Sequence, residues 1–95
     1  MGLPDELFPL FEMPVGGKLR KLRRPLVLRV SIEDGEYFVE NETLSLFGNG
    51  PSLPEAVAEF FSSLVSTWEY YKGLGEDQVI GRGRELKAIL DHLTE

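Results

Sequence analysis

The sequence predicts an α+β fold in which an antiparallel three-stranded meander is packed by one long helix, with a short second helix near the C-terminus. Three observations predict it. Apolar and polar residues alternate over residues 25–33, an Asp-Gly pair follows directly, and an apolar stripe at helical spacing covers residues 53–71. A period of two indicates a half-buried strand, whereas steps of three and four indicate an amphipathic helix.

The three strands are expected at residues 25–33, 37–41 and 43–47. One face of the first strand collects the apolar side chains Leu26, Leu28, Val30 and Ile32. Asp34-Gly35 supplies the positive φ angles that a tight hairpin turn needs. Asn41-Glu42 turns the chain again, Leu44 and Leu46 are expected to point inward, and Gly48-Asn49-Gly50-Pro51 is expected to end the third strand.

The long helix has clear start and stop signals. Ser52-Leu53-Pro54-Glu55 reads as a capping box, in which the Ser52 side chain accepts from the backbone of Glu55. Glycines at positions 73 and 75 provide the stop. The apolar stripe between them consists of Leu53, Val57, Phe60, Phe61, Leu64, Trp68 and Tyr71. A weaker repeat through Leu86, Ile89 and Leu90 predicts a short helix over residues 84–92.

The chain is expected to form one domain over residues 25–95, preceded by a proline-rich apolar arm and a basic linker over residues 1–24. Prolines at positions 4, 9 and 14 disfavour a helix, so residues 1–17 are expected to lack regular structure and to pack, extended or as short turns, on the domain or on a neighbour. The second face of the meander, with Val27 and Phe38, also needs cover. The N-terminal segment, the last helix or a second subunit could supply it.

Composition narrows the function class. The chain has 95 residues, no cysteine and a net charge of −6, so disulfides and thiolate metal sites are excluded. No stretch has the ~20 apolar residues of a membrane span, and the acidic, proline-containing start does not match a signal peptide. These features predict a cytoplasmic protein with no membrane association. The small size favours a homo-oligomer, most simply a dimer.

No catalytic or metal-binding signature is present, so we expect neither an enzyme nor a cofactor. His92 is the one histidine, and a histidine at a helix end is most often solvated. The acidic residues around the Asp34-Gly35 turn lack the spacing of a calcium loop. The glycines at positions 48 and 50 precede a helix without completing a phosphate-binding motif. A single Gly81-Arg82-Gly83-Arg84 run in an acidic context reads as a loop.

Two groups of residues are candidates for binding. Phe8, Leu10 and Phe11 are too apolar for a solvated tail, and Tyr70 faces away from the helical stripe, so these four are the candidates for contact with a partner protein. The second group is the basic strip Lys18, Arg20, Lys21, Arg23 and Arg24. It is either a nucleic-acid contact or, more simply, a solvated linker or a basic flank that discourages strand pairing.

Residues 34–61 resemble the HicB-like antitoxin family. The resemblance rests on the Asp34-Gly35 turn, the strand Tyr37-Phe38-Val39, and the run Gly50-Pro51-Ser52-Leu53-Pro54-Glu55-Ala56 that opens the helix. More loosely it covers residues 25–72. The sequence departs from the family pattern in its tight turn between the second and third strands, and in having no DNA-binding segment after the helix. The resemblance implies a dimer that neutralises a small, basic, RNA-cutting toxin.

Three functions are compatible with these observations. The first is a non-enzymatic interaction module, a HicB-like antitoxin or a relative of one, that binds a small basic protein. The charge distribution favours it, because residues 30–95 carry thirteen acids and four bases. The second is a nucleic-acid-binding regulator that uses the basic strip. The third is a structural homo-oligomer or accessory subunit that docks through its apolar N-terminal segment.

Overall fold

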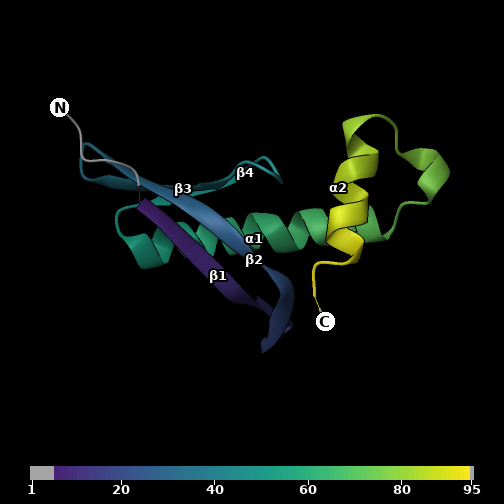
Figure 1. Cartoon of the computed structure of the whole chain (residues 1–95). Coiled ribbons are helices and arrows are strands. Elements are labelled where there is room, and N and C mark those ends of the chain that lie inside the picture. Colours follow the sequence, from purple (N-terminus) through teal and green to yellow (C-terminus); the bar gives the residue numbers. More distant parts are fainter. Residues whose placement is uncertain (1–5, 95) are drawn as a thin grey trace.

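The computed structural model describes residues 6–94 (Figure 1). The elements are β1 (Glu6–Val15), β2 (Lys18–Glu33), β3 (Glu36–Asn41), β4 (Leu46–Gly50), α1 (Leu53–Lys72), the 3-10 turn η1 (Glu76–Gln78) and α2 (Arg82–Asp91). The predicted α+β class is confirmed. The predicted strand number is wrong, because the antiparallel sheet has four strands in the order β1-β2-β3-β4. Within residues 6–94, no helix is long and apolar enough to cross a membrane.

The additional strand lies in the segment that was expected to lack regular structure. β1 pairs with β2 from Glu6 opposite Val30 to Val15 opposite Lys18, so the predicted basic linker is itself part of β2. β1 is an edge strand, and an edge strand accepts proline because one side of it makes no ladder hydrogen bonds. The rest of the predicted N-terminal arm, residues 1–5, lies outside the described residues.

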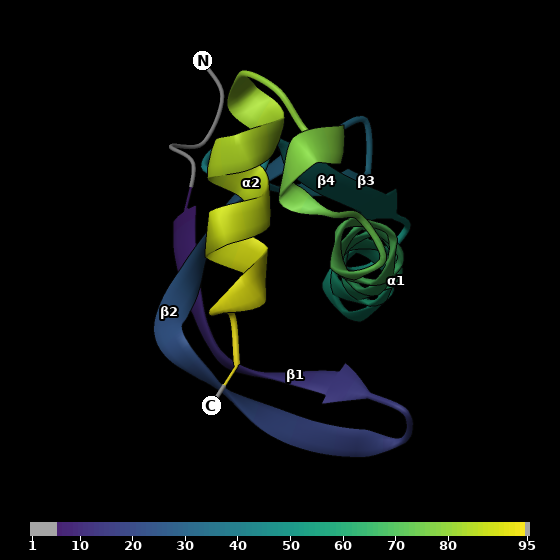
Figure 2. The same ribbon diagram turned by 90° about the vertical axis from the view of Figure 1, so that its right-hand side faces the viewer.

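β2 bends sharply where its register with β1 shifts. Leu10 is opposite Leu26 and Glu12 is opposite Lys21, so Phe11 alone spans residues 22–25 of β2. A bulge of this kind bends the strand, and the far end of the β1–β2 hairpin turns away from the rest of the sheet (Figure 2). The backbone freed at the bulge pairs with the C-terminal end, where Arg23 N–H donates to the Leu93 carbonyl at 3.0 Å.

β4 starts three residues later than the predicted third strand. The buried Asn41 side chain accepts the Leu44 N–H at 2.8 Å, and Ser45 has a φ of 56°, so residues 42–45 form a turn instead of a strand. Leu44 nevertheless points inward and is buried. Gly48 was expected to end the third strand but lies within β4. The backbone of α1 passes so close to this position that it leaves no room for a side chain. A Cβ at Gly48 would meet the backbone of Ala56 and Phe60.

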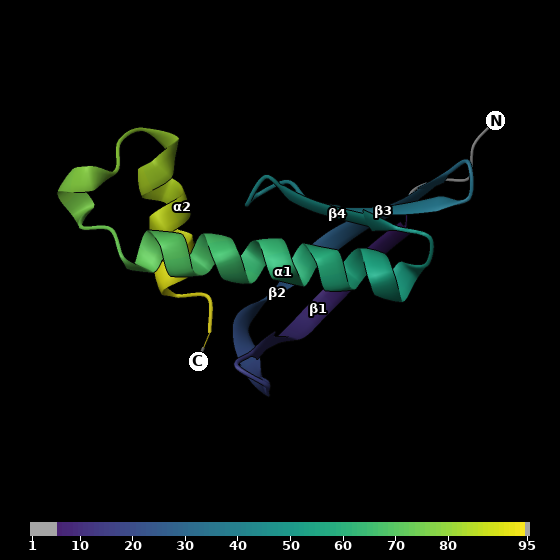
Figure 3. The same ribbon diagram turned by 180° about the vertical axis from the view of Figure 1, so that it is seen from behind.

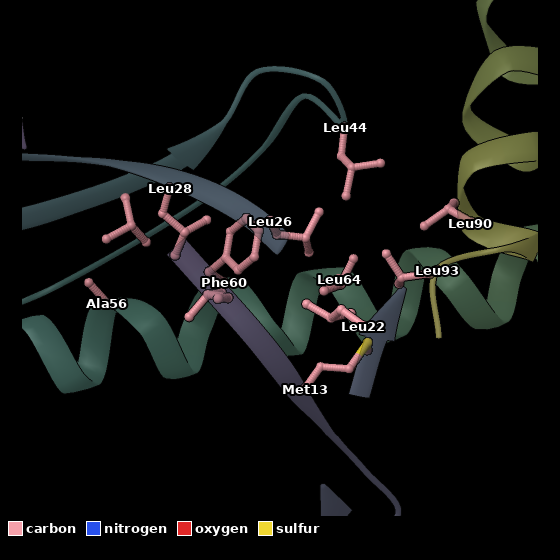
Figure 4. Packing of buried hydrophobic residues seen from close by; sticks show 12 residues of the cluster. Met13, Leu22, Leu26, Leu28, Leu44, Ala56, Phe60, Leu64, Leu90 and Leu93 are labelled. Carbon is pink, nitrogen blue, oxygen red and sulfur yellow. The ribbon is translucent and has the colours of Figure 1, made fainter. Parts of the chain in front are cut away.

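The long helix agrees with its prediction, and it covers the inner face of the sheet (Figure 3). The Ser52 hydroxyl accepts the Glu55 N–H at 3.3 Å, and Gly73 ends the helix. Phe60 and Leu64 are fully buried against Leu28 of β2 and Met13 of β1 in one core cluster (Figure 4). α2 packs across the C-terminal end of α1 and adds Leu90 to this core.

Candidate interaction surface

The face of the sheet that points away from α1, here called the outer face, carries exposed apolar side chains. Opposed residues of paired strands share a face, so the register places Leu7, Arg29, Glu40 and Phe47 in one row across all four strands. Leu7 is 68% exposed and Phe47 is 65% exposed. Val27, in the next row beside Pro9, is 45% exposed. This face therefore presents apolar side chains from β1, β2 and β4 to solvent.

The charged groups of the outer face are mainly acidic. The Arg29 guanidinium lies 2.8 Å from a carboxylate oxygen of Glu42 and 3.6 Å from one of Glu40. Glu33 and Glu36 oppose each other in the last row of the β2–β3 pair and carry no ion pair within residues 6–94. Two like charges directly across a sheet repel, so a positive group placed over them would be attracted.

Two of the three expected covers for this face are not over it. Residues 6–15 form β1, which extends the sheet sideways instead of lying across it. α2 packs against α1 at one end of the molecule (Figure 1). Residues 1–5 fall outside the described residues. The third expected cover, a second subunit, stays a prediction.

A groove of about 950 Å³ continues from the outer face to the end of α2. Val27 and Arg29 form one wall, Glu42 and Thr43 of the β3–β4 turn another, and Ile89 and His92 of the α2 region a third. The Asn41 side chain holds the β3–β4 turn next to β2, because its amide donates to the Val27 carbonyl at 3.1 Å while its oxygen accepts the Leu44 N–H of the turn. The groove thus joins the outer face to the C-terminal region in one concave surface.

The four predicted partner-binding residues do not form one site. Leu10 is buried in the core of this chain, so its side chain does not form part of the surface. Phe8 is opposite Leu28 on the inner side of the sheet edge, and Phe11 is exposed at the bulge. Tyr70 is exposed on α1, where its ring meets Tyr71 edge-on at 5.5 Å.

The basic strip is divided between two places. Lys18, Arg20 and Lys21 are exposed in the far end of the β1–β2 hairpin. Arg23 and Arg24 lie at the bulge and line the groove, and the Arg23 Nε donates to the Thr94 carbonyl at 2.9 Å. Arg23 therefore has a structural role in holding the C-terminal end.

The glycine-arginine run at residues 81–84 and His92 were also considered as functional motifs from the sequence. Gly81 precedes α2, the Arg82 guanidinium donates to the Thr43 carbonyl at 2.8 Å, and Arg84 donates to the Val79 carbonyl at 3.1 Å. His92 follows the end of α2 and is exposed. Among the residues that the structure describes, no three His, Asp or Glu side chains are grouped so that they could hold a metal ion.

The outer-face residues Leu7 and Phe47 were not among the candidates. The sequence signal for Phe47 is its position next to the inward Leu46, since neighbours in a strand point to opposite faces. Leu7 could be placed only after residues 6–15 were recognised as a strand.

No protein family, curated protein or solved structure was found to match this chain. The resemblance to HicB-like antitoxins therefore stays a prediction.

Proposed function

We propose that this chain is a non-enzymatic interaction module that binds a basic protein over the outer face of its sheet. One observation carries the proposal: Leu7, Val27 and Phe47 stand exposed on the face of the sheet that points away from the core and from α1. Full burial of such side chains contributes about 1.5–3 kcal/mol each. A partner that covers these partly exposed groups gains a fraction of that from each one.

The acidic charge of the outer face favours a basic partner. Among the described strand residues, the outer face carries three acids, Glu33, Glu36 and Glu40, and one base, Arg29. Complementary charge raises the association rate and selects among partners. The HicB-like resemblance names one partner of this kind, a small basic RNA-cutting toxin, and we include it in the proposal as the candidate to test first.

Self-association into a dimer is a further part of the proposal. The free edge of β1 is a poor site for it, because Pro9 and Pro14 lack the N–H that an added strand would need. A dimer is therefore expected to form through side-chain packing and not by extending the sheet. The mass of the purified chain in solution measures this directly.

The test is affinity capture of the tagged chain from its own cells, followed by mass spectrometry. We expect one small basic protein in near-equal amount. Glu33→Gln with Glu36→Gln should reduce its recovery at low salt, because the double variant removes two outer-face acids that form no ion pair with the residues that the structure describes. Glu59→Gln with Glu69→Gln, which changes two exposed acids of α1, is the matched control and should recover the partner fully.

Two results would contradict the proposal. Recovery of the bait alone, with a dimer mass in solution, would indicate a self-associating domain without a basic partner. Equal loss of recovery in both double variants would show that the attraction comes from overall charge and not from the outer face.

A further inference from the structure

α1 covers the inner face of the sheet unevenly. It packs mainly against β4 and β3 and only slightly against β1. Phe8 of β1, opposite the buried Leu28, is 42% exposed, and Ile32 of β2, on the same face as Leu28, is 50% exposed. A helix is about 10 Å in diameter and neighbouring strands lie about 4.8 Å apart, so one helix covers about two strands. The inner face of β1 and of the adjoining end of β2 is therefore left partly uncovered.

The flank of α1 on the side of β1 is apolar. The backbone at Ala56 faces Gly48 of β4, whereas Leu64, further round the helix, lies near Met13 of β1 in the same core cluster (Figure 4). At 3.6 residues per turn, the side chains beyond Leu64 in the same direction are apolar and half-buried: Val57, Phe61, Val65 and Trp68. Strand and helix residues thus form one apolar surface, here called the inner patch and defined by Phe8, Ile32, Val57, Phe61 and Val65.

The two ends of the inner patch carry opposite charge. Glu6 lies on the inner face at the start of β1, where it is exposed. About 30 Å along the strand, Arg20 and Lys18 are exposed on the same face, because they are opposite Met13 and Val15. Within residues 6–94, none of these three charged side chains forms an ion pair. The inner patch is therefore acidic at one end and basic at the other.

We propose that the inner patch is the contact surface between two copies of this chain, related by a two-fold axis through the middle of the patch. A two-fold interface brings the same surface of each copy together, here in opposite directions. The Glu6 end of each copy then meets the Arg20 end of the other, and two charge contacts flank an apolar contact. The inference rests on the dimer of the proposed function and does not depend on the basic partner of the outer face.

A second copy fits the inner patch better than a partner of a single charge sign. A basic protein would place like charge against Arg20 and Lys18, and an acidic protein would place like charge against Glu6, and like charges in contact oppose binding. A copy of this chain presents both charges in the matching order. It also brings its own Phe8 and Ile32, so apolar side chains of both partners leave water together.

Sedimentation equilibrium of the full chain measures the dimer. At about 1–100 μM the mass should rise toward twice the 10.7 kDa of one chain, because interfaces of standard size have dissociation constants in the micromolar range or below. Phe8→Thr with Ile32→Thr should raise the dissociation constant about tenfold or more. Leu7→Thr with Phe47→Thr, which changes exposed apolar side chains of the outer face, is the matched control and should dimerise within about twofold of the unchanged chain.

Charge reversal tests the order of the two ends. Glu6→Arg and Arg20→Glu should each weaken the dimer at low salt, because each change places two like charges in contact. The variant with both changes restores opposite charges in the reversed order, so it should recover most of the lost affinity. Circular dichroism checks that each variant is folded, and both positions are exposed.

The inference is overturned if the chain stays monomeric up to about 100 μM, or if the two threonine pairs weaken the dimer equally. It is also overturned if the double charge variant is as weak as the single ones. A monomer that still captures a basic protein would overturn this inference and leave the outer-face proposal standing. A dimer of the expected behaviour that captures no basic protein would support this inference and contradict the outer-face proposal.

Discussion

Gly48 lies where the backbone of α1 comes closest to the sheet. Its missing Cβ leaves room for the Ala56 carbonyl and for the Phe60 backbone nitrogen, which would be 2.5 Å from an added Cβ. Both neighbours are backbone atoms of a helix, so they cannot move aside as a flexible side chain could. The contact sets the distance between α1 and β4, and this distance determines how Phe60 packs.

Gly48→Ala should therefore lower the free energy of unfolding by about 2–3 kcal/mol, because the added methyl overpacks a rigid contact. Urea denaturation measures the change. Gly83→Ala is the control, since its Cβ would meet its nearest atom, on Val79, at an ordinary 3.7 Å. It should leave stability unchanged or raise it by up to about 1 kcal/mol, because alanine favours a helix over glycine. Equal losses in both variants would contradict the close approach.

Asn41 connects the core to the groove. Its amide donates to the Val27 carbonyl and its oxygen accepts the Leu44 N–H. Asn41→Ala should cost about 1–3 kcal/mol of unfolding free energy, because it leaves a buried backbone N–H without a partner. Asn49→Ala, on the outer face of β4, is the control and should cost much less, since within residues 6–94 the Asn49 side chain makes no hydrogen bond. Thermal denaturation of the two variants measures the difference. An equal loss of stability in Asn41→Ala and Asn49→Ala would refute the structural role of Asn41.

At the scale of elements, α1 depends on its cap as well as on its buried face. Ser52→Ala removes the acceptor for the Glu55 N–H and should destabilise the fold by about 1 kcal/mol. Ser66→Ala changes the same residue type at an exposed position inside α1, where alanine is the better helix former. Circular dichroism at increasing temperature should show a lower midpoint for the first variant and an equal or higher one for the second. The reverse order would show that the cap contributes nothing.

Some elements could be predicted because their signals are local. The cap at Ser52, the apolar stripe and Gly73 define α1 without any tertiary information, and Asp34 and Gly35 both adopt the positive φ that the turn required. β1 was missed because proline disfavours a strand everywhere except at an edge, and edge position is a property of the whole sheet. β4 was misplaced because its glycines read as a stop, whereas α1 needs them for close approach.

The interaction surface was predicted only in part for the same reason. The alternation of residues 25–33 assigned Val27 to a second face, but the exposure of that face depends on where the N-terminal segment and the last helix lie. Leu10 and Phe11 are adjacent in sequence and equally apolar, yet one is buried and the other is 61% exposed at the bulge. Neighbouring side chains of a strand point to opposite faces, so the two separate, but this could be applied only once residues 6–15 were recognised as a strand.

At the scale of the whole molecule, charge and apolar exposure are arranged on different parts. Residues 12–24 carry five bases and one acid, whereas the outer face combines Leu7, Val27 and Phe47 with acidic neighbours. Replacing the exposed bases Arg20 and Lys21 by alanine should therefore leave the capture of a basic protein intact. A loss of capture in this double variant would mean that the partner is not held by the outer face alone.

The central claim is that the outer face binds the partner, and its most direct test is the affinity of the captured protein for Val27→Thr with Phe47→Thr. Threonine keeps the strand preference and removes the apolar contact, so calorimetric titration should show binding weakened about tenfold or more, the effect of about 1.4 kcal/mol. Ile80→Thr, at an apolar side chain that is 82% exposed outside the sheet, should bind within about twofold of the unchanged chain. Unchanged affinity in the double variant, or an equal loss in Ile80→Thr, would contradict the account.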